Sequence, residues 1–171
     1  MPAVDFWSLF GQFLGLVAVV LGFLTYQMRT PRQLLLIQTV TCVVFCAHYF
    51  LIGATSGLVL NAVGVVRNIV YYNRDKKLFS GAYVPYVFAL IMLVLGIFTW
   101  QSWYSLLVIV GLAINTVCMS LQDAQKIRKS ILVSSPLVLL YNVLSLSIGG
   151  IIFEAISIVS AIIGIFRNRK Q

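Results

Sequence analysis

One acidic residue, Glu154, lies inside a long apolar stretch, where a carboxylate is costly. A charged side chain at bilayer depth costs about 2.5–3.5 kcal/mol and usually faces a partner or a cavity. Small and polar residues follow it at helical spacing, and a second stretch shows a matching pattern. The two stripes are Glu154, Ser157, Ala161 and Gly164, and Asn61, Gly64, Asn68 and Tyr71. We expect Glu154, Asn61 and Asn68 to line a solute site; the alternative is interhelical hydrogen bonding, worth about 0.6–2 kcal/mol each.

A third stripe carries the single histidine of the chain. It consists of Gln38, Thr41, Phe45 and His48, again at i, i+3, i+7 and i+10. His48 and Glu154 are each about four residues from one end of their helices, so both lie roughly 6–8 Å below the same boundary. A histidine–carboxylate pair at one depth could bind a polar solute or relay a proton. The alternative is a buried histidine that bonds a neighbouring carbonyl.

Other polar residues inside apolar stretches complete the set of candidate site residues. Tyr141 and Asn142 lie in one stretch and Asn115 in another, and we include all three with Gln38 as substrate-binding candidates. Arg67 is expected to be a snorkelling or gating residue. Catalytic motifs and paired carboxylates are absent from the sequence, so we expect no enzyme, no cofactor and no metal site. The cysteines are expected to be small packing residues.

The composition places these residues in an integral membrane protein. The 171 residues are 61% hydrophobic and only 9% charged, against roughly 25% charged in a soluble domain. Runs near twenty residues predict an all-α membrane protein, residues 1–171, with seven transmembrane helices. They are Phe6–Tyr26, Leu34–Ile52, Thr55–Tyr72, Tyr83–Trp100, Trp103–Met119, Ile131–Ile148 and Gly150–Phe166. The first is expected to be a span and not a cleaved signal, because no basic segment precedes it.

The loops between these spans alternate in charge. One set is short and uncharged ("GATS", "QS", "SIGG"), and the other is basic ("QMRTPRQ", "NRDKK", "QDAQKIRK", "RNRKQ"). The positive-inside rule makes the basic set cytoplasmic, with the N-terminus outside and the C-terminus inside. The net charge of +8 is then an orientation signal and a contact for anionic lipids, and nucleic-acid binding is not expected.

The chain also contains a weak internal repeat. A shift of 93 residues lays "HYFLIGATSGLVLNAVGVVRNIVYYNR" (48–74) over "YNVLSLSIGGIIFEAISIVSAIIGIFR" (141–167) without a gap. Gly57 then meets Gly150, and Asn61 meets Glu154. We predict two parallel triple-helix repeats, residues 6–77 and 103–170, joined by a linker helix at 83–100. Parallel repeats of this kind are one known plan of membrane transporters, in which the substrate site lies near the midplane between the halves.

This 3+1+3 plan resembles the SWEET, PnuC and PQ-loop superfamily. More closely, "HYFLIG…LNAV…R" and "SIGGIIFEA…FR" resemble the bacterial inner-membrane YgjV-type family. The resemblance implies a SWEET-like fold in the bacterial inner membrane. It also implies that Asn61 faces the central site, with Glu154 in place of the second asparagine found in SWEET-type transporters. No Pro-Gln dipeptide ends the first span, and only Pro136 corresponds to the prolines that hinge SWEET helices.

Two functions follow as hypotheses. The first is a small-solute transporter or facilitator that works by alternating access, with an unidentified solute. The second is a membrane receptor, scaffold or assembly factor built on the same frame. A water-accessible cavity at the depth of Asn61 and Glu154 would distinguish them, and we expect a monomer or weak homodimer in either case.

Overall fold

The computed structural model describes residues 6–121 and 123–167, which form seven α-helices and no strand. The predicted all-helical fold and helix number are thus confirmed for this part of the chain; residues 168–170 of the second predicted repeat lie outside it. The helices are α1 (Phe6–Gln27), α2 (Pro31–Leu51), α3 (Thr55–Tyr72), α4 (Val84–Phe98), α5 (Ser105–Met119), α6 (Ala124–Leu144) and α7 (Ile148–Arg167).

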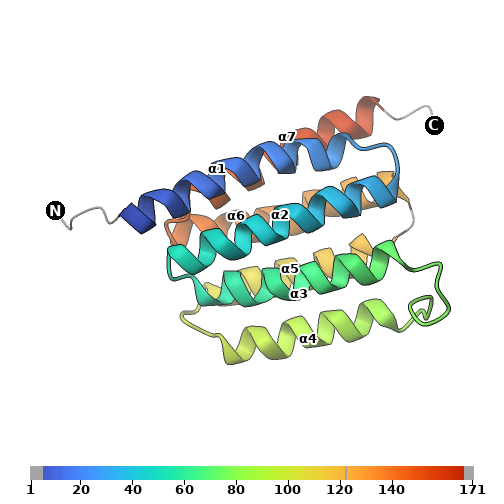
Figure 1. The fold of residues 1–171 in the computed structure, drawn as a ribbon, viewed down its shortest axis with the longest axis horizontal. Helices are drawn as coiled ribbons and strands as arrows, with labels where there is room; N and C mark the ends of the chain where they lie inside the picture. Colours follow the sequence, from blue (N-terminus) through green and yellow to red (C-terminus); the bar gives the residue numbers. More distant parts are fainter. Residues whose placement is uncertain (1–5, 122, 168–171) are drawn as a thin grey trace.

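The helices run roughly side by side in two layers (Figure 1). One layer holds α1, α2, α3 and α4 in chain order, and α7, α6 and α5 lie behind it. Helix α1 packs against α2 and α7, and α6 packs against α5 and α7. Helix α4 packs against α5 and, less extensively, α3, so it occupies the edge of the bundle.

Four of the described helices, α1, α2, α6 and α7, are long and apolar enough to cross a membrane. Helices α4 and α5 are apolar but have only 15 residues each. Helix α3 has 18 residues and carries Asn61, Arg67 and Asn68 in its interior, which lowers its hydropathy. Large apolar side chains point outward along several helices, for example Phe13, Leu90 and Ile97. This is the surface expected of a protein whose surroundings are lipid.

Helix α6 begins seven residues before the predicted span, and the physical reason is its N-cap. The Asp123 carboxylate accepts hydrogen bonds from the backbone N–H groups of Gln125 and Lys126, at 2.8 and 3.3 Å. Such a cap satisfies N–H groups that have no partner inside the helix. Part of the predicted basic loop is therefore the first two turns of α6.

The other end of α6 also differs from the prediction. The helix stops at Leu144, not at Ile148, because Leu146 takes a left-handed backbone conformation with φ 55°. Ser147 immediately precedes the next helix, and its hydroxyl accepts a hydrogen bond from the Gly150 N–H at 3.2 Å. Helix α7 consequently starts two residues earlier than the sequence indicated.

Two glycines allow α1 and α7 to touch. A Cβ atom added at Gly149 would lie 2.6 Å from the Cα of Gly15, and one added at Gly15 would lie 2.9 Å from the Cα of Gly149. Both distances are shorter than real Cβ contacts, and the neighbouring atom is backbone in each case. Small residues at such crossings let two backbones approach within packing distance in a membrane.

We predict that Gly149→Val separates α1 from α7 and destabilises the fold. Overpacking of a tight contact costs about 1–3 kcal/mol. Thermal unfolding of the purified protein in detergent measures the effect. The matched control is Ile148→Val, which places the same side chain one residue away at an exposed position and should leave the melting temperature unchanged. Equal melting temperatures for the two variants would contradict the close-contact interpretation.

Candidate functional site

A small cavity lies in the interior of the bundle, between the two layers of helices. Its volume is about 40 Å³, which is room for roughly three water molecules at 10–15 Å³ each. Four of the predicted site residues line it: Gln38 on α2, Asn61 on α3, Asn115 on α5 and Glu154 on α7. Helix α6 adds Ser134 and Ser135. We call this space the central cavity.

Glu154 is the one acidic residue among the described residues that line the central cavity. It is only 8% exposed, and Ser135 lines the cavity with it. No Lys, Arg or His is among the described residues that line the cavity. The carboxyl group thus lies in the protein interior without a cationic side chain beside it.

Three amide side chains in the cavity have oxygen atoms that can accept a further hydrogen bond. The Gln38 Oε1 and Asn115 Oδ1 atoms are buried and have no hydrogen-bond partner among the described residues. Asn61 donates its Nδ2 group to the Gly57 carbonyl of its own helix at 2.8 Å, which leaves its Oδ1 atom free to accept. An unsatisfied buried polar atom costs about 1–3 kcal/mol. These groups therefore favour water or a bound ligand in the cavity.

One side of the cavity is aromatic. Phe45 packs edge-to-face on Phe153, with ring centroids 4.6 Å apart, and stacks with Tyr49 at 5.4 Å. Both phenylalanines and Tyr49 line the cavity, and Tyr26 lies at another part of its wall. Phe45 lies on the predicted stripe of α2, whereas Tyr26, Tyr49 and Phe153 fall outside the predicted stripes. Phe153 immediately precedes Glu154, and adjacent residues of a helix do not share one i, i+3, i+7 stripe.

His48 lies outside the central cavity. Its Nδ1 atom is 2.8 Å from the Gly11 carbonyl oxygen, and its Nε2 atom is 3.0 Å from the Ser147 hydroxyl. The ring is fully buried, and both nitrogens have partners. This is the alternative arrangement, a histidine bonded to a neighbouring carbonyl. The structure thus brings His48 to Gly11 and Ser147, and not to Glu154.

Three other predicted site residues also lie in neighbouring networks. The Tyr49 hydroxyl donates to Asn142 Oδ1 at 3.0 Å. Tyr141 is buried in an apolar cluster, 6.0 Å from the ring of Tyr104. Asn68 accepts two hydrogen bonds from the guanidinium group of Arg67, at 3.0 and 2.8 Å. None of the three is among the described residues that line the cavity.

Arg67 is buried and does not snorkel. It is 2% exposed, and its Nη1 atom also donates to the Thr116 hydroxyl at 2.8 Å. One turn later, the Tyr71 hydroxyl donates to the Thr116 carbonyl at 3.0 Å, and Arg74 donates to the Ser120 carbonyl at 2.6 Å. These bonds fasten the end of α3 that carries the basic loop to the end of α5.

A second set of bonds fastens α7 to α1 at the same end. Ser160 donates to the Phe23 carbonyl at 2.9 Å, and Arg167 donates to the Gln27 carbonyl at 3.0 Å. Arg128, at 1% exposure, donates to the carbonyls of Tyr26 and Met28 beside these bonds. The bundle is therefore closed by hydrogen bonds at its basic end.

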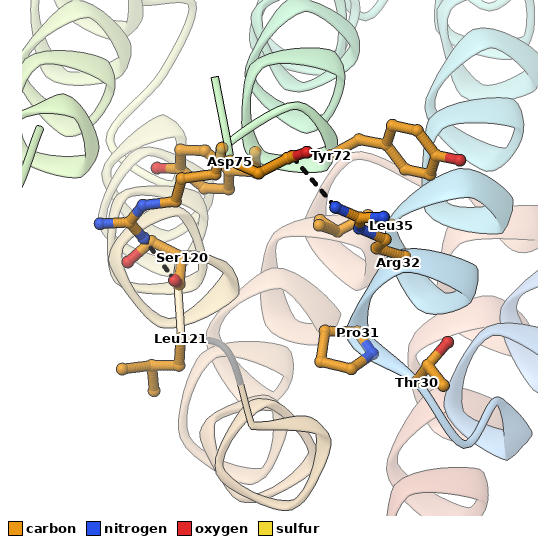
Figure 2. Close-up of a pocket in the computed structure, with 10 residues that line it drawn as sticks. Thr30, Pro31, Arg32, Leu35, Tyr72, Asp75, Ser120 and Leu121 are labelled. Carbon is orange, nitrogen blue, oxygen red and sulfur yellow. Dashed lines mark hydrogen bonds and ion pairs between the residues drawn. The ribbon is translucent and has the colours of Figure 1, made fainter. Parts of the chain in front are cut away.

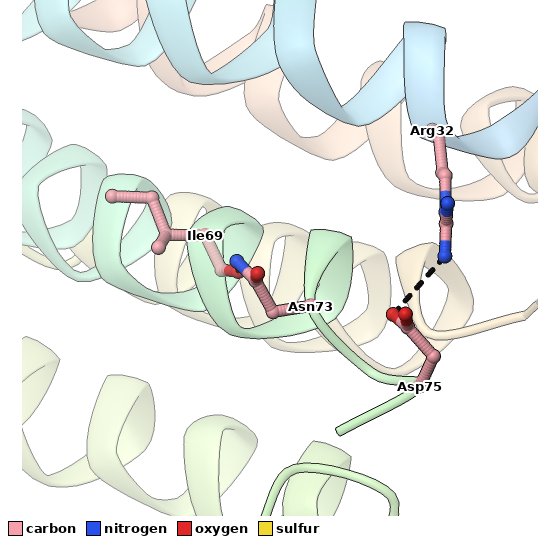
Figure 3. Close-up of polar contacts among 4 residues, drawn as sticks. All are labelled: Arg32, Ile69, Asn73 and Asp75. Atoms are coloured by element: carbon pink, nitrogen blue, oxygen red, sulfur yellow. Dashed lines mark hydrogen bonds and ion pairs between the residues drawn. The ribbon is translucent and has the colours of Figure 1, made fainter.

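An open cleft of about 490 Å³ lies outside this closure (Figure 2). It is bounded by Thr30 and Arg32 before and within α2, by Asp75 after α3, and by Leu121 after α5. Arg32 and Asp75 form an ion pair across it at 3.1 Å (Figure 3). Both side chains are more than 60% exposed, and an exposed pair of this kind contributes only about 0–1 kcal/mol.

We predict that His48→Ala lowers the free energy of unfolding, because it removes the hydrogen bonds of the buried ring to the Gly11 carbonyl and the Ser147 hydroxyl. The expected loss is about 1–3 kcal/mol, measured by thermal unfolding in detergent. Ser157→Ala is the matched control: its hydroxyl is buried without a described partner, so its removal should leave stability equal or higher. A stable His48→Ala protein would remove the structural role assigned to this ring.

Within the described residues, no group of three or more His, Cys, Asp or Glu side chains is placed to hold a metal ion. No curated protein and no solved structure matches the chain. A sequence model of the Imp-YgjV family, described as "Bacterial inner membrane protein", matches residues 9–171. This match covers nearly the whole chain, and the long apolar helices agree with it. The protein therefore belongs to the Imp-YgjV family of bacterial inner membrane proteins.

Proposed function

We propose that the protein is a small-solute transporter or facilitator that works by alternating access between two triple-helix bundles. The first bundle is α1–α3, the second is α5–α7, and α4 links them. The observation that carries this proposal is the central cavity, because it contains buried amide oxygens without partners and takes residues from both bundles. A scaffold needs no such polar space in its interior, whereas a transporter needs a site that both sides can reach in turn.

Hydrogen bonds support the two-bundle arrangement. Tyr49 and Asn142 bond each other and are 93 residues apart, so they occupy equivalent positions of the proposed repeats. The bond from Arg74 to the Ser120 carbonyl has a counterpart from Arg167 to the Gln27 carbonyl. The two donors, and likewise the two acceptors, are related by the same shift of 93 residues. Direct contact between equivalent positions is what a twofold axis along the bundle requires. Parallel repeats of this kind are one of the known transporter plans.

The orientation proposed from the loops accounts for the ends of the bundle. The connection between α1 and α2, the segment after α3 and the end of α7 all lie at one end of the bundle (Figure 1). The positive-inside rule makes this end cytoplasmic, with all seven helices crossing the membrane. The closure by Arg67, Tyr71 and Arg74 is then a cytoplasmic gate, and the bond between Tyr49 and Asn142 lies on the outer side of the cavity.

We predict that single cysteines in the loops report this orientation. In a background where Cys42, Cys46 and Cys118 are alanine, Ser80→Cys in the basic loop should react with an impermeant thiol reagent only in inside-out vesicles. Gln101→Cys, in an uncharged loop, should react only in intact cells. Both side chains are exposed, so neither is shielded by the fold. The reverse pattern would invert the proposed topology.

Alternating access is tested by cysteines in the cavity. In the same background, Asn61→Cys and Ser134→Cys should react with a small, impermeant thiol reagent from either side of the membrane, because water reaches the cavity from each side in turn. Leu60→Cys is the matched control, since this neighbour of Asn61 is fully buried in an apolar cluster and should not react. Cavity cysteines that react no faster than Leu60→Cys would favour the scaffold hypothesis.

A further inference from the structure

We infer that the central cavity binds a monovalent cation, with Glu154 as its charge partner and the amide oxygens of Gln38 and Asn115 as neutral ligands. This inference rests on the proposed function, because it names the chemical class of the solute for the same cavity. Two kinds of monovalent cation fit these ligands: an alkali metal ion and a small protonated amine. The charge, the donor set and the size of the cavity each support it.

The charge of the cavity favours a cation. Glu154 is the one ionisable carboxyl group of the wall, and no described cationic side chain lines the cavity to balance it. The buried arginines have partners elsewhere: Arg67 bonds Asn68 and Thr116, and Arg128 bonds the carbonyls at the end of α1. An ionised carboxyl group is costly in the protein interior unless a cation compensates it, and a bound cation would supply that charge.

The hydrogen-bonding groups of the cavity include several acceptors that a cation could use. Gln38 Oε1 and Asn115 Oδ1 are unpartnered acceptors, and Asn61 gives one of its two N–H groups to the Gly57 carbonyl and keeps its Oδ1 atom to accept. The Ser134 hydroxyl donates to the Ser130 carbonyl at 3.2 Å, which leaves only its lone pairs for a ligand. Carbonyl, hydroxyl and carboxylate oxygens are the groups that replace the hydration shell of a hard cation.

The size and charge of the cavity limit the cation to one that is small and singly charged. Ca²⁺ sites usually combine several carboxylates and Mg²⁺ usually keeps several of its waters, whereas the described wall of this small cavity has one carboxyl group. A volume of about 40 Å³ accepts an ion with one or two waters, or a small amine, but not a sugar or nucleoside ring. Phe45, Tyr49 and Phe153 add aromatic faces beside the acid, and such faces attract ammonium groups.

The ligands come from both bundles: Gln38 and Asn61 from the first, and Asn115 and Glu154 from the second. A bound cation would therefore join the two halves and stabilise the folded protein in proportion to its occupancy. Because a ligand stabilises by RT ln(1 + [L]/Kd), the shift should rise with concentration on a logarithmic scale.

The test is thermal unfolding of the purified full chain in detergent, at constant ionic strength and pH. Chloride salts of sodium, potassium, ammonium and methylammonium each replace the bulky cation N-methyl-D-glucamine. We expect at least one of them to raise the melting temperature with concentration. Glu154→Gln should weaken that apparent affinity about tenfold or more, equivalent to about 1.4 kcal/mol. Asp75→Asn, which removes an exposed carboxylate from the cytoplasmic cleft, is the matched control and should keep the response.

Asn115→Leu is a second variant, which keeps the carboxyl group and removes one neutral ligand. It should also weaken the response to the cation, and it tests the inference even if Glu154→Gln does not fold. The four salts distinguish the sources, since a response confined to sodium or potassium indicates a metal ion, and one confined to the amines indicates an organic solute. Absence of any response, a full response in both variants, or an equal response to the neutral solute glycerol would overturn the inference. Cation binding without flux in liposomes would overturn transport alone, whereas a water-accessible cavity without cation binding would overturn this inference alone.

Discussion

Every polar group inside a membrane bundle must find its partner within the protein, and this constraint organises the whole structure. Water is absent from the hydrocarbon region, so a side chain such as Arg67 or His48 is tolerated only where a neighbouring helix offers an acceptor. The helices are accordingly joined by polar contacts at both ends. Arg67, Tyr71 and Arg74 join α3 to α5, while His48 bonds a carbonyl of α1 and the turn before α7.

Against this background, the exceptions identify the site. Where most buried polar atoms have partners, the free oxygens of Gln38 and Asn115 lie beside a carboxyl group in one small cavity. The cost of leaving them unsatisfied is comparable to that of a core mutation. Groups of this kind persist at sites where function requires them, and the rest of the fold offsets their cost.

Periodicity and charge predicted the number of helices and the main polar stripes. The spacing of Asn61 and Glu154 placed them on inward faces, and both line the cavity. The partners of His48 could not be predicted in the same way. Its ring approaches α1 because Gly15 has no side chain to exclude it, a tertiary contact that no local pattern reveals. The start of α6 was misjudged for a related reason: Lys126, Arg128 and Lys129 mark a loop by charge, yet Arg128 is buried against the carbonyls that end α1.

The hydrogen bond between Tyr49 and Asn142 joins two different residue types. On the proposed twofold relation, a phenol from one half meets an amide from the other, so the contact is asymmetric although the positions are equivalent. Two copies of the first bundle alone would place phenol against phenol, with the Asn142 amide missing. Two copies of the second would place Asn142 against Asn142. On that relation the two halves are complementary at this contact, and joining them in one chain fixes a pairing that a homodimer of either half would lack.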